Sequence, residues 1–217
     1  MSWANAKDFS VPATAAGYAV LKNGGNALDA VVTMAGVLAV VRPHMNGVGG
    51  DAFGIFFDGE TGDVVGMNGS GRAGALATPS FFEQAGRESI PGSGPLSVSV
   101  PGAVAAWDDA LGRFGTISLA EALAPGIGYA RDGFPVSSRL ASDIAGASRG
   151  LNEPGLGLYL PGGSPPPVGS LLKNPALAAT LERIAMEGKS GFYRGVPAEA
   201  ISAFLEREGG YLRAPDF

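Results

Sequence analysis

The glycine-rich run Asn68-Gly69-Ser70-Gly71-Arg72-Ala73 carries the residue types best suited to hold a small anion. Arg72 offers a planar fork of N–H donors that matches two carboxylate oxygens, and Ser70 adds a hydroxyl. The glycines allow the backbone to come close to a ligand. A surface arginine paired with an aspartate or with water is an equally good interpretation of Arg72. Arg72 and Ser70 are therefore candidate substrate-binding residues, and the structural alternative stays open.

A second glycine-rich run, Asn46-Gly47-Val48-Gly49-Gly50-Asp51, suggests a phosphate-binding loop, because successive backbone N–H groups can cradle an anion. A dinucleotide-binding loop follows a strand and opens a helix. This run instead follows a predicted helix and precedes a predicted strand, and it has no lysine of the P-loop type. The pattern favours a tight structural turn near an active site or in the core.

Histidine and cysteine usage excludes several kinds of catalysis. The single histidine, His44, has no identifiable acid–base partner, so we expect it to be a hydrogen-bonded structural group. Gly69-Ser70-Gly71 is only a fragment of the Gly-x-Ser-x-Gly elbow, which argues against a Ser-His-Asp triad. The absence of cysteine removes disulfides, thiolate nucleophiles and zinc–sulfur sites. No metal and no cofactor are predicted.

Composition indicates a folded protein that works on small molecules or proteins. Of 217 residues, 46% are hydrophobic and 16% are charged, which argues against disorder. A net charge of −5 disfavours binding to nucleic acid or to a membrane surface. Residues 1–10 are polar and lack the apolar core of a signal peptide, so we expect a cytoplasmic protein unless a leader was removed. We expect a single domain over residues 1–217 without an internal boundary.

The elements that must position these loops begin with two helices. Pro12 suits a first helical turn, and Gly24-Gly25 suits a helix end. Asn26, with Asp29 three positions later, predicts a capping box that opens a buried helix over 27–41. Small residues on both helices, with Ala15, Ala16 and Ala19 on the first, predict a tight hairpin.

The pattern then predicts a β-hairpin and a mainly helical second half. Strands over 53–57 and 63–67 flank an Asp- and Gly-rich turn, and both are expected to be largely buried. Further helices are predicted from about Pro79 and over 101–111, 118–131, 137–147, 175–187 and 197–208, with a short strand over 96–100. The stretch 152–170, rich in proline and glycine, is predicted to be an irregular covering loop.

Several motifs resemble one family when they are taken together and in order. They are Lys22-Asn23-Gly24-Gly25-Asn26-Ala27-Leu28-Asp29-Ala30, the run 40–53 with its glycine loop, Val100-Pro101-Gly102, Arg113-Phe114-Gly115-Thr116, the run 130–137, the run 180–185, and Gly191-Phe192-Tyr193-Arg194-Gly195. From about residue 10 to the end, this series resembles the γ-glutamyltranspeptidase family of N-terminal-nucleophile hydrolases.

The resemblance implies an α+β fold, an α/β/β/α sandwich made by a precursor that cuts itself in two. The freed threonine at the start of the small subunit attacks an amide carbonyl while its own α-amine acts as base. The threonines here are Thr14, Thr33, Thr61, Thr78, Thr116 and Thr180. None has the family's processing context, in which histidine and serine follow closely. The chain is therefore expected to be an incomplete large subunit with no catalytic residue of its own, inactive alone, whose partner is its own small subunit.

The loop that carries Arg72 departs from the pattern of true transpeptidases. Their Arg-Glu-x-Ala-Pro segment after the second strand grips the substrate's α-carboxylate, and ungapped alignment places Ser70 at the position of that arginine. Arg72 lies two residues later. The loop is more similar to the amidohydrolase branch of the family, which includes oxamate amidohydrolase-like and acylase-like members. Arg42 also stands where the family usually has an acidic residue.

The leading hypothesis is an amidohydrolase that acts on a small amide bearing a carboxylate, with hydrolysis favoured over transfer. A true γ-glutamyl transferase or glutathione hydrolase is the alternative among enzymes. A non-catalytic homologue that only binds a ligand or partner is the alternative outside enzymes.

Overall fold

The computed structural model describes residues 11–217, which form two compact units. Unit 1 contains residues up to Gly47 together with Gly115–Glu182, and unit 2 contains Val48–Phe114 together with Arg183–Phe217. Each unit thus combines two segments that are distant in sequence. The chain passes from one unit to the other more than once. The single domain expected over residues 1–217 stays a prediction.

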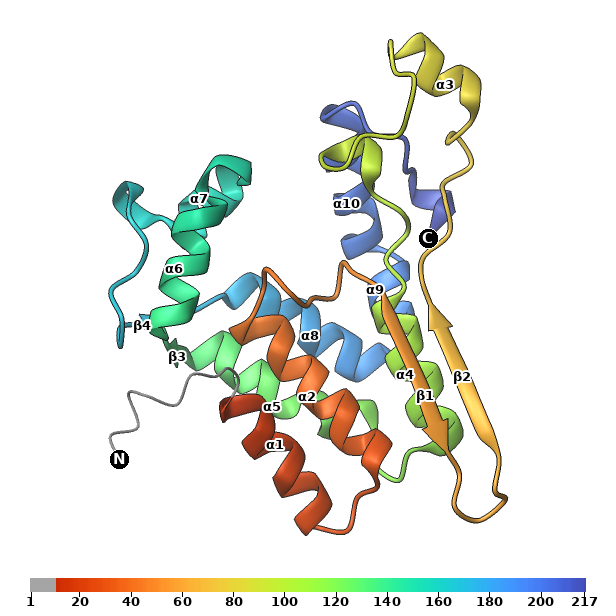
Figure 1. Cartoon of the computed structure of the whole chain (residues 1–217), viewed down its shortest axis with the longest axis vertical. Coiled ribbons are helices and arrows are strands. Elements are labelled where there is room, and N and C mark those ends of the chain that lie inside the picture. Colours follow the sequence, from red (N-terminus) through yellow and green to blue (C-terminus); the bar gives the residue numbers. More distant parts are fainter. Residues whose placement is uncertain (1–10) are drawn as a thin grey trace. The chain divides into compact units, whose positions relative to one another are not determined.

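Unit 1 is built on three helices that run side by side in Figure 1: α1 (Val11–Lys22), α2 (Ala27–Val41) and α5 (Leu119–Asp132). The predicted capping box is present, because Asn26 and Asp29 each accept a hydrogen bond from the other's backbone N–H. Helix α2 is buried along most of its length, as predicted, although Val31 is exposed.

Close packing of these helices depends on glycine. A Cβ added to Gly17 of α1 would lie 2.7 Å from the Met34 side chain of α2, and one added to Gly126 of α5 would lie 2.7 Å from the Gly36 oxygen. The predicted face of α1 was wrong in detail: Ala13 and Gly17 are buried, whereas Ala15 and Ala19 are exposed. The spacing of small residues alone could not distinguish these faces.

The remaining elements of unit 1 follow α5. Strand β3 (Phe134–Pro135) pairs antiparallel with β4 (Leu171–Leu172), and between them lie α6 (Ser138–Ala147) and α7 (Glu153–Tyr159). Helix α7, with Asn152 as its N-cap, falls in the stretch that was predicted to be irregular. Helix α8 (Pro175–Glu187) follows, and the chain passes into unit 2 within it.

Unit 2 contains the predicted β-hairpin, formed by β1 (Ala52–Phe57) and β2 (Val64–Gly69). The strands are antiparallel, with Phe53 opposite Asn68 and Phe57 opposite Val64. One face of the hairpin packs against α4 (Ala103–Phe114), where the rings of Phe56 and Phe114 lie 5.0 Å apart.

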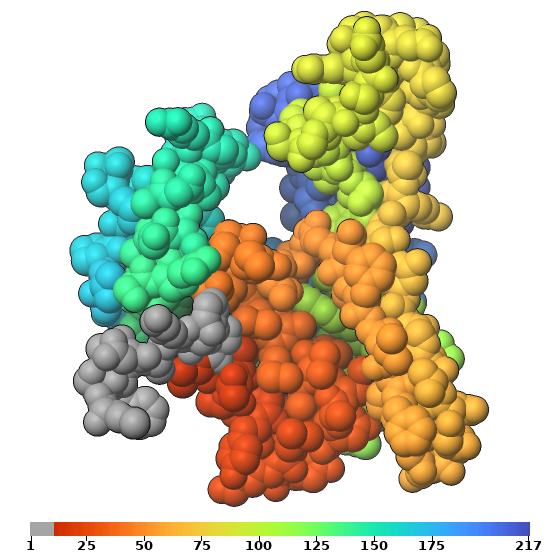
Figure 2. All heavy atoms as spheres, viewed as in Figure 1, coloured from red at the N-terminus to blue at the C-terminus, as the bar shows by residue number. Residues whose placement is uncertain are grey.

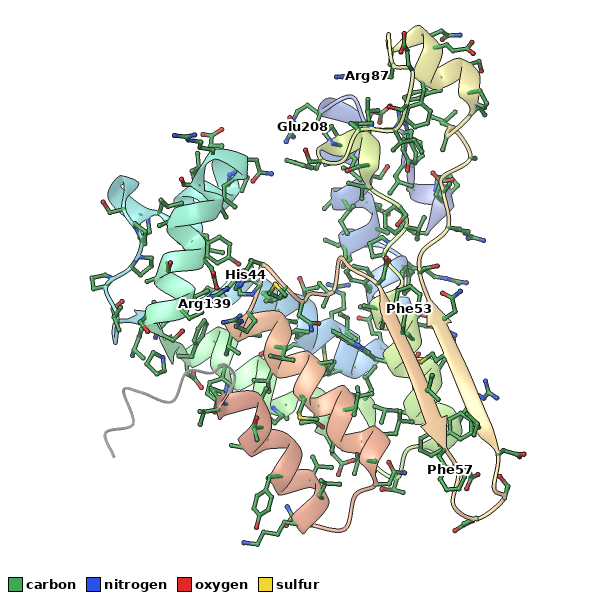
Figure 3. All side chains as sticks on the ribbon, viewed as in Figure 1. His44, Phe53, Phe57, Arg87, Arg139 and Glu208 are labelled. Carbon is green, nitrogen blue, oxygen red and sulfur yellow. The ribbon has the colours of Figure 1, made fainter. Side chains whose placement is uncertain are left out.

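The other face of the hairpin is exposed, which corrects the expectation of largely buried strands. Burial alternates along both strands, and Phe53, Ile55, Phe57 and Val64 are between 64% and 84% exposed. Figure 3 labels Phe53 and Phe57 near the two ends of β1, and in Figure 2 the atoms of the hairpin lie at the surface in view. The sequence showed apolar strands but could not show that no described element covers one face.

The rest of unit 2 consists of short helices around a small core. Helices α3 (Pro79–Gln84), α9 (Ser190–Tyr193) and α10 (Val196–Arg207) are joined by irregular segments and by 3₁₀ turns at Pro95–Ser97 and Ala214–Asp216. The buried cluster is formed by Phe82, Val100, Leu205, Tyr211 and Leu212. The predicted strand over 96–100 is wrong, because this segment begins with a 3₁₀ turn and joins neither sheet.

Within residues 11–217, no helix is both long and apolar enough to cross a bilayer. The prediction about a signal sequence concerns residues 1–10, which lie outside the described part of the chain.

Candidate functional site

The loop that carries Ser70 and Arg72 leaves the end of β2 through a side-chain-stabilised turn. The Asn68 side-chain oxygen accepts a hydrogen bond from the Ser70 N–H at 3.0 Å. The Gly71 N–H then donates to Asp51 Oδ1, at 3.3 Å, just before β1. The start of the loop is thus attached to the segment that precedes the hairpin's first strand.

Glycine is required where this loop meets the segment before α4. A Cβ on Gly71 would lie 1.4 Å from the Val100 oxygen, and one on Gly102 would lie 2.0 Å from the Gly69 oxygen. The Val100 N–H also donates to the Arg72 carbonyl oxygen at 2.9 Å. Backbone therefore packs directly on backbone, with no room for side chains.

The glycine loop before β1 completes this arrangement. The Gly50 carbonyl oxygen accepts hydrogen bonds from the Gly102 and Ala103 N–H groups at 3.0 Å and 2.9 Å. These are N–H groups at the start of α4 that have no partner within the helix. The Gly50 carbonyl group of loop 46–51 thus caps the start of α4. This structural role agrees with the predicted tight turn and not with a phosphate-binding loop.

The Arg72 side chain is exposed. Its Nη2 donates to the main-chain oxygen of Asp216 at 3.2 Å, and among the described residues no carboxylate lies within salt-bridge distance. Ser70 is also exposed, and within the described chain its hydroxyl makes no hydrogen bond. Among the described residues, no aspartate side chain pairs with Arg72, and the alternative of an arginine paired with water stays open.

Asp216 and Asp51 are polar residues of this region that the sequence did not single out. Asp51 borders the second glycine run, and its loop hydrogen bond crosses 20 positions. Asp216 is 144 positions from Arg72. No spacing rule links residues this far apart, so the sequence carried no signal for the contact with Asp216.

An open groove of about 630 Å³ lies along the hairpin. Its lining consists of Phe53, Gly54, Ile55, Gly66, Met67 and Asn68. The groove reaches Asn68 but does not include Ser70 or Arg72. Among residues 11–217, no group of three or more His, Cys, Asp or Glu side chains could hold a metal ion.

His44 belongs to a charged cluster in unit 1. Its Nε2 lies 3.0 Å from Asp143 Oδ2, and the same carboxylate meets Arg139 Nε at 2.8 Å and Arg42 Nη1 at 3.9 Å. Figure 3 labels His44 beside Arg139. Burial lowers the pKa of His44, and the attraction of Asp143 opposes this effect without overcoming it. The cluster explains the buried Arg42 as a partner of Asp143 that ties the end of α2 to α6.

The sequence matches the family described as gamma-glutamyltranspeptidase over residues 13–217. It is 38% identical to the glutathione hydrolase-like YwrD proenzyme of Bacillus subtilis, over 94% of this chain and 39% of that protein. It is 41% identical to the oxamate amidohydrolase proenzyme of Klebsiella pneumoniae, over 85% of this chain and 36% of that protein. The chain thus spans well under half of the length of these two relatives.

A solved structure shows the same fold. The gamma-glutamyltranspeptidase of Helicobacter pylori superimposes with a TM-score of 0.90 and 30% identity, over 97% of this chain and 62% of that chain. The expected α+β fold of the N-terminal-nucleophile hydrolases is confirmed. From the family match over residues 13–217, the two relatives and this superposition, we conclude that the chain belongs to the gamma-glutamyltranspeptidase family.

Proposed function

We propose that the full-length protein is an amide hydrolase that acts on a small substrate bearing a carboxylate, which Arg72 binds with help from Ser70. The observation that carries this proposal is the exposed Arg72 guanidinium on a fixed loop without a carboxylate partner among the described residues. A guanidinium in this state can form two parallel charge-assisted hydrogen bonds with a ligand carboxylate.

The chemistry would be supplied by a threonine outside this chain. Its hydroxyl would attack the amide carbonyl while its free α-amine accepts the hydroxyl proton. The amine product would then take up this proton and depart, and water would hydrolyse the acyl-enzyme that remains. In this scheme the described chain binds and orients the substrate and contributes no nucleophile. Expressed without the threonine, it would be inactive.

Transfer to an amine acceptor and glutathione hydrolysis are the alternative activities, because one relative is named a glutathione hydrolase-like proenzyme. The full-length protein should be incubated with a γ-glutamyl anilide, with and without a dipeptide acceptor, and separately with oxamate. We expect hydrolysis that the acceptor does not accelerate. Faster release of the aniline product with the acceptor would identify a transferase.

A non-catalytic homologue is the third possibility, and the rest of the gene decides it. Absence of a threonine at the processing junction would rule out the enzyme whatever the fold. Presence of that threonine together with self-cleavage into two chains would rule out a purely ligand-binding protein.

The Arg72 proposal predicts a defined kinetic loss. In the processed full-length enzyme, Arg72→Ala should lower kcat/KM by roughly ten- to a hundredfold, because a charge-assisted contact contributes about 1.5–3 kcal/mol. Arg72→Lys should recover only part of the loss, since an ammonium lacks the planar fork. Steady-state kinetics on the carboxylate-bearing amide measures both.

Arg87→Ala is the matched control, because Arg87 is an exposed arginine of the same unit that follows α3 and is labelled in Figure 3. Its kcat/KM should equal that of the unaltered enzyme, and self-cleavage should proceed in all three variants. An Arg72→Ala enzyme that is processed and has an unchanged kcat/KM would show that Arg72 does not bind substrate.

We further propose that the remaining part of the protein covers the exposed face of the hairpin. The two relatives are named as proenzymes and are more than twice as long as the matched region. An apolar face formed by Phe53, Ile55, Phe57 and Val64 would then become part of a shared core instead of contacting water.

A further inference from the structure

We infer that Asp216 is a positioning residue that holds the Arg72 guanidinium in place while leaving its charge available to an anion. The inference deepens the proposed function and rests on it, because it concerns how the substrate-binding arginine is oriented. The evidence is three hydrogen bonds, in which three oxygen atoms of Asp216 accept from three different residues.

The Asp216 carboxylate joins two segments through their backbones. Its Oδ1 accepts a hydrogen bond from the Ala75 N–H at 2.8 Å, and its Oδ2 accepts one from the Arg213 N–H at 2.8 Å. Both carboxylate oxygens are therefore used to bind main-chain donors, and Asp216 fastens the loop after Arg72 to the segment 213–216.

Close packing limits movement at this junction. Gly74 is buried, and a Cβ at this position would lie 2.7 Å from both Asp216 Oδ2 and the Leu212 side chain. Leu212 is itself 1% exposed and belongs to the buried cluster of unit 2. At Arg72 itself, the Val100 N–H of the same cluster donates to the Arg72 carbonyl oxygen at 2.9 Å. The backbone of the loop is thus attached to the core of unit 2 at Arg72 and packed against it at Gly74.

The third contact orients the guanidinium itself. The main-chain oxygen of Asp216 accepts a hydrogen bond from Arg72 Nη2 at 3.2 Å. A carbonyl oxygen carries only a partial charge, so it can orient the guanidinium without neutralising it, as a carboxylate partner would. An arginine has five N–H donors, and this contact leaves the others for a ligand.

The test uses the processed full-length enzyme and a carboxylate-bearing amide substrate. Asp216→Ala should raise KM about three- to tenfold with little change in kcat, because the hydrogen bonds from Ala75 and Arg213 to the carboxylate would be lost and Arg72 would sample more orientations. Asp216→Asn keeps one carbonyl oxygen and should show a smaller increase. In an Arg72→Ala background, Asp216→Ala should cause no further loss, since the residue acts through Arg72.

Asp58→Ala is the matched control. Asp58 also accepts backbone hydrogen bonds, from Glu60 and Thr61 in the hairpin turn, but it makes no contact with the Arg72 loop. This variant should leave KM unchanged. Hydrogen exchange gives a readout that does not depend on activity: the amides of Ala75 and Arg213 should exchange faster in Asp216→Ala and not in Asp58→Ala.

The outcomes separate this inference from the proposed function. If Arg72→Ala has no effect on kcat/KM, the substrate role of Arg72 fails, and the inference fails with it. If Arg72→Ala lowers kcat/KM while Asp216→Ala leaves it unchanged, or lowers it equally in both backgrounds, only the inference is overturned. Unchanged exchange at Ala75 and Arg213 would also overturn it.

Discussion

The Asp29 carboxylate joins two segments of unit 1 that are far apart in sequence. Its oxygens accept hydrogen bonds from the Asn26 N–H at 2.8 Å, the Thr116 hydroxyl at 2.6 Å, and the N–H groups of Thr116 and Ile117 at 2.9 Å and 3.4 Å. The side chain is fully buried. Burial by itself would raise the pKa of Asp29, but these hydrogen bonds outweigh it and hold the pKa below its ordinary value.

Asp29→Ala is expected to destabilise the full-length protein by about 2–4 kcal/mol, because it leaves several buried donors without an acceptor. Denaturant unfolding at pH 7 measures this change. Asp132→Ala provides the control, because Asp132 is exposed and pairs with its neighbour Arg131. Asp132→Ala should leave the unfolding midpoint unchanged. An equal effect of both substitutions would show that the hydrogen bonds of Asp29 do not stabilise the fold.

The lowered pKa of Asp29 also predicts a pH dependence. A carboxyl whose folded-state pKa lies below its unfolded value stabilises the fold above about pH 4, and this contribution is lost as pH falls through the folded-state pKa. The difference in unfolding free energy between the unaltered protein and Asp29→Ala should therefore become smaller as the pH is lowered from about 5 through the folded-state pKa of Asp29. A difference from the unaltered protein that stays constant over this range would refute the pKa assignment.

At the scale of elements, the region around Arg72 depends on backbone segments that touch without side chains between them. The start of α4 is attached on several sides: Gly50 accepts from the first N–H groups, and the Tyr193 hydroxyl accepts from the Ala105 N–H at 3.1 Å and donates to the Pro101 oxygen at 2.6 Å. Helix α4 thereby holds the segment against which the Arg72 loop packs.

Gly102→Ala is predicted to disrupt this junction, because its Cβ would lie 2.0 Å from the Gly69 oxygen and the backbone would have to move. We expect a loss of about 2–4 kcal/mol in stability together with a rise in KM. Gly112→Ala is the matched control within α4, where a Cβ would meet nothing within 4 Å. It should stabilise the helix slightly, by about 0.5–1 kcal/mol. Thermal melting and steady-state kinetics test both, and equal stability of the two variants would contradict the packing argument.

At the scale of the whole molecule, the described residues leave one apolar face of the hairpin uncovered. Ile55 is 84% exposed at the centre of that face, opposite Gly66. In the absence of a cover, such an apolar face and the open strand edges beside it favour aggregation. We therefore expect the chain expressed alone to aggregate. A monodisperse chain that melts cooperatively would argue against this view.

Ile55→Asp in the full-length precursor tests the proposed cover. A charge buried there would cost several kcal/mol, so we expect at least about a tenfold drop in the yield of processed enzyme. Met186→Asp is the control, because Met186 is also an exposed apolar side chain of unit 2, 78% exposed, but lies on α8. Gel analysis of the two cleaved chains measures the yield. Normal processing of Ile55→Asp, or equal losses in both variants, would show that the face is not an assembly surface.

The sequence alone predicted the features that local interactions decide. The capping box of Asn26 and Asp29, the 3.6-residue periodicity of the helices and the Asp- and Gly-rich hairpin turn involve residues a few positions apart, and these elements form where expected. The ordered series of motifs also identified the family. The Ser70 and Arg72 loop could be proposed as a site because its residue types suit an anion.

Tertiary structure decided what depends on distant partners. The segment before Val100 is not a strand, since the Val100 N–H binds the Arg72 oxygen in a contact that closes no sheet. The apolar pattern of β1 did not reveal which face α4 would leave exposed. Asp216 reaches the Arg72 loop across 144 positions. Neither periodicity nor capping rules extend over such separations, because the contact exists only after the chain has folded.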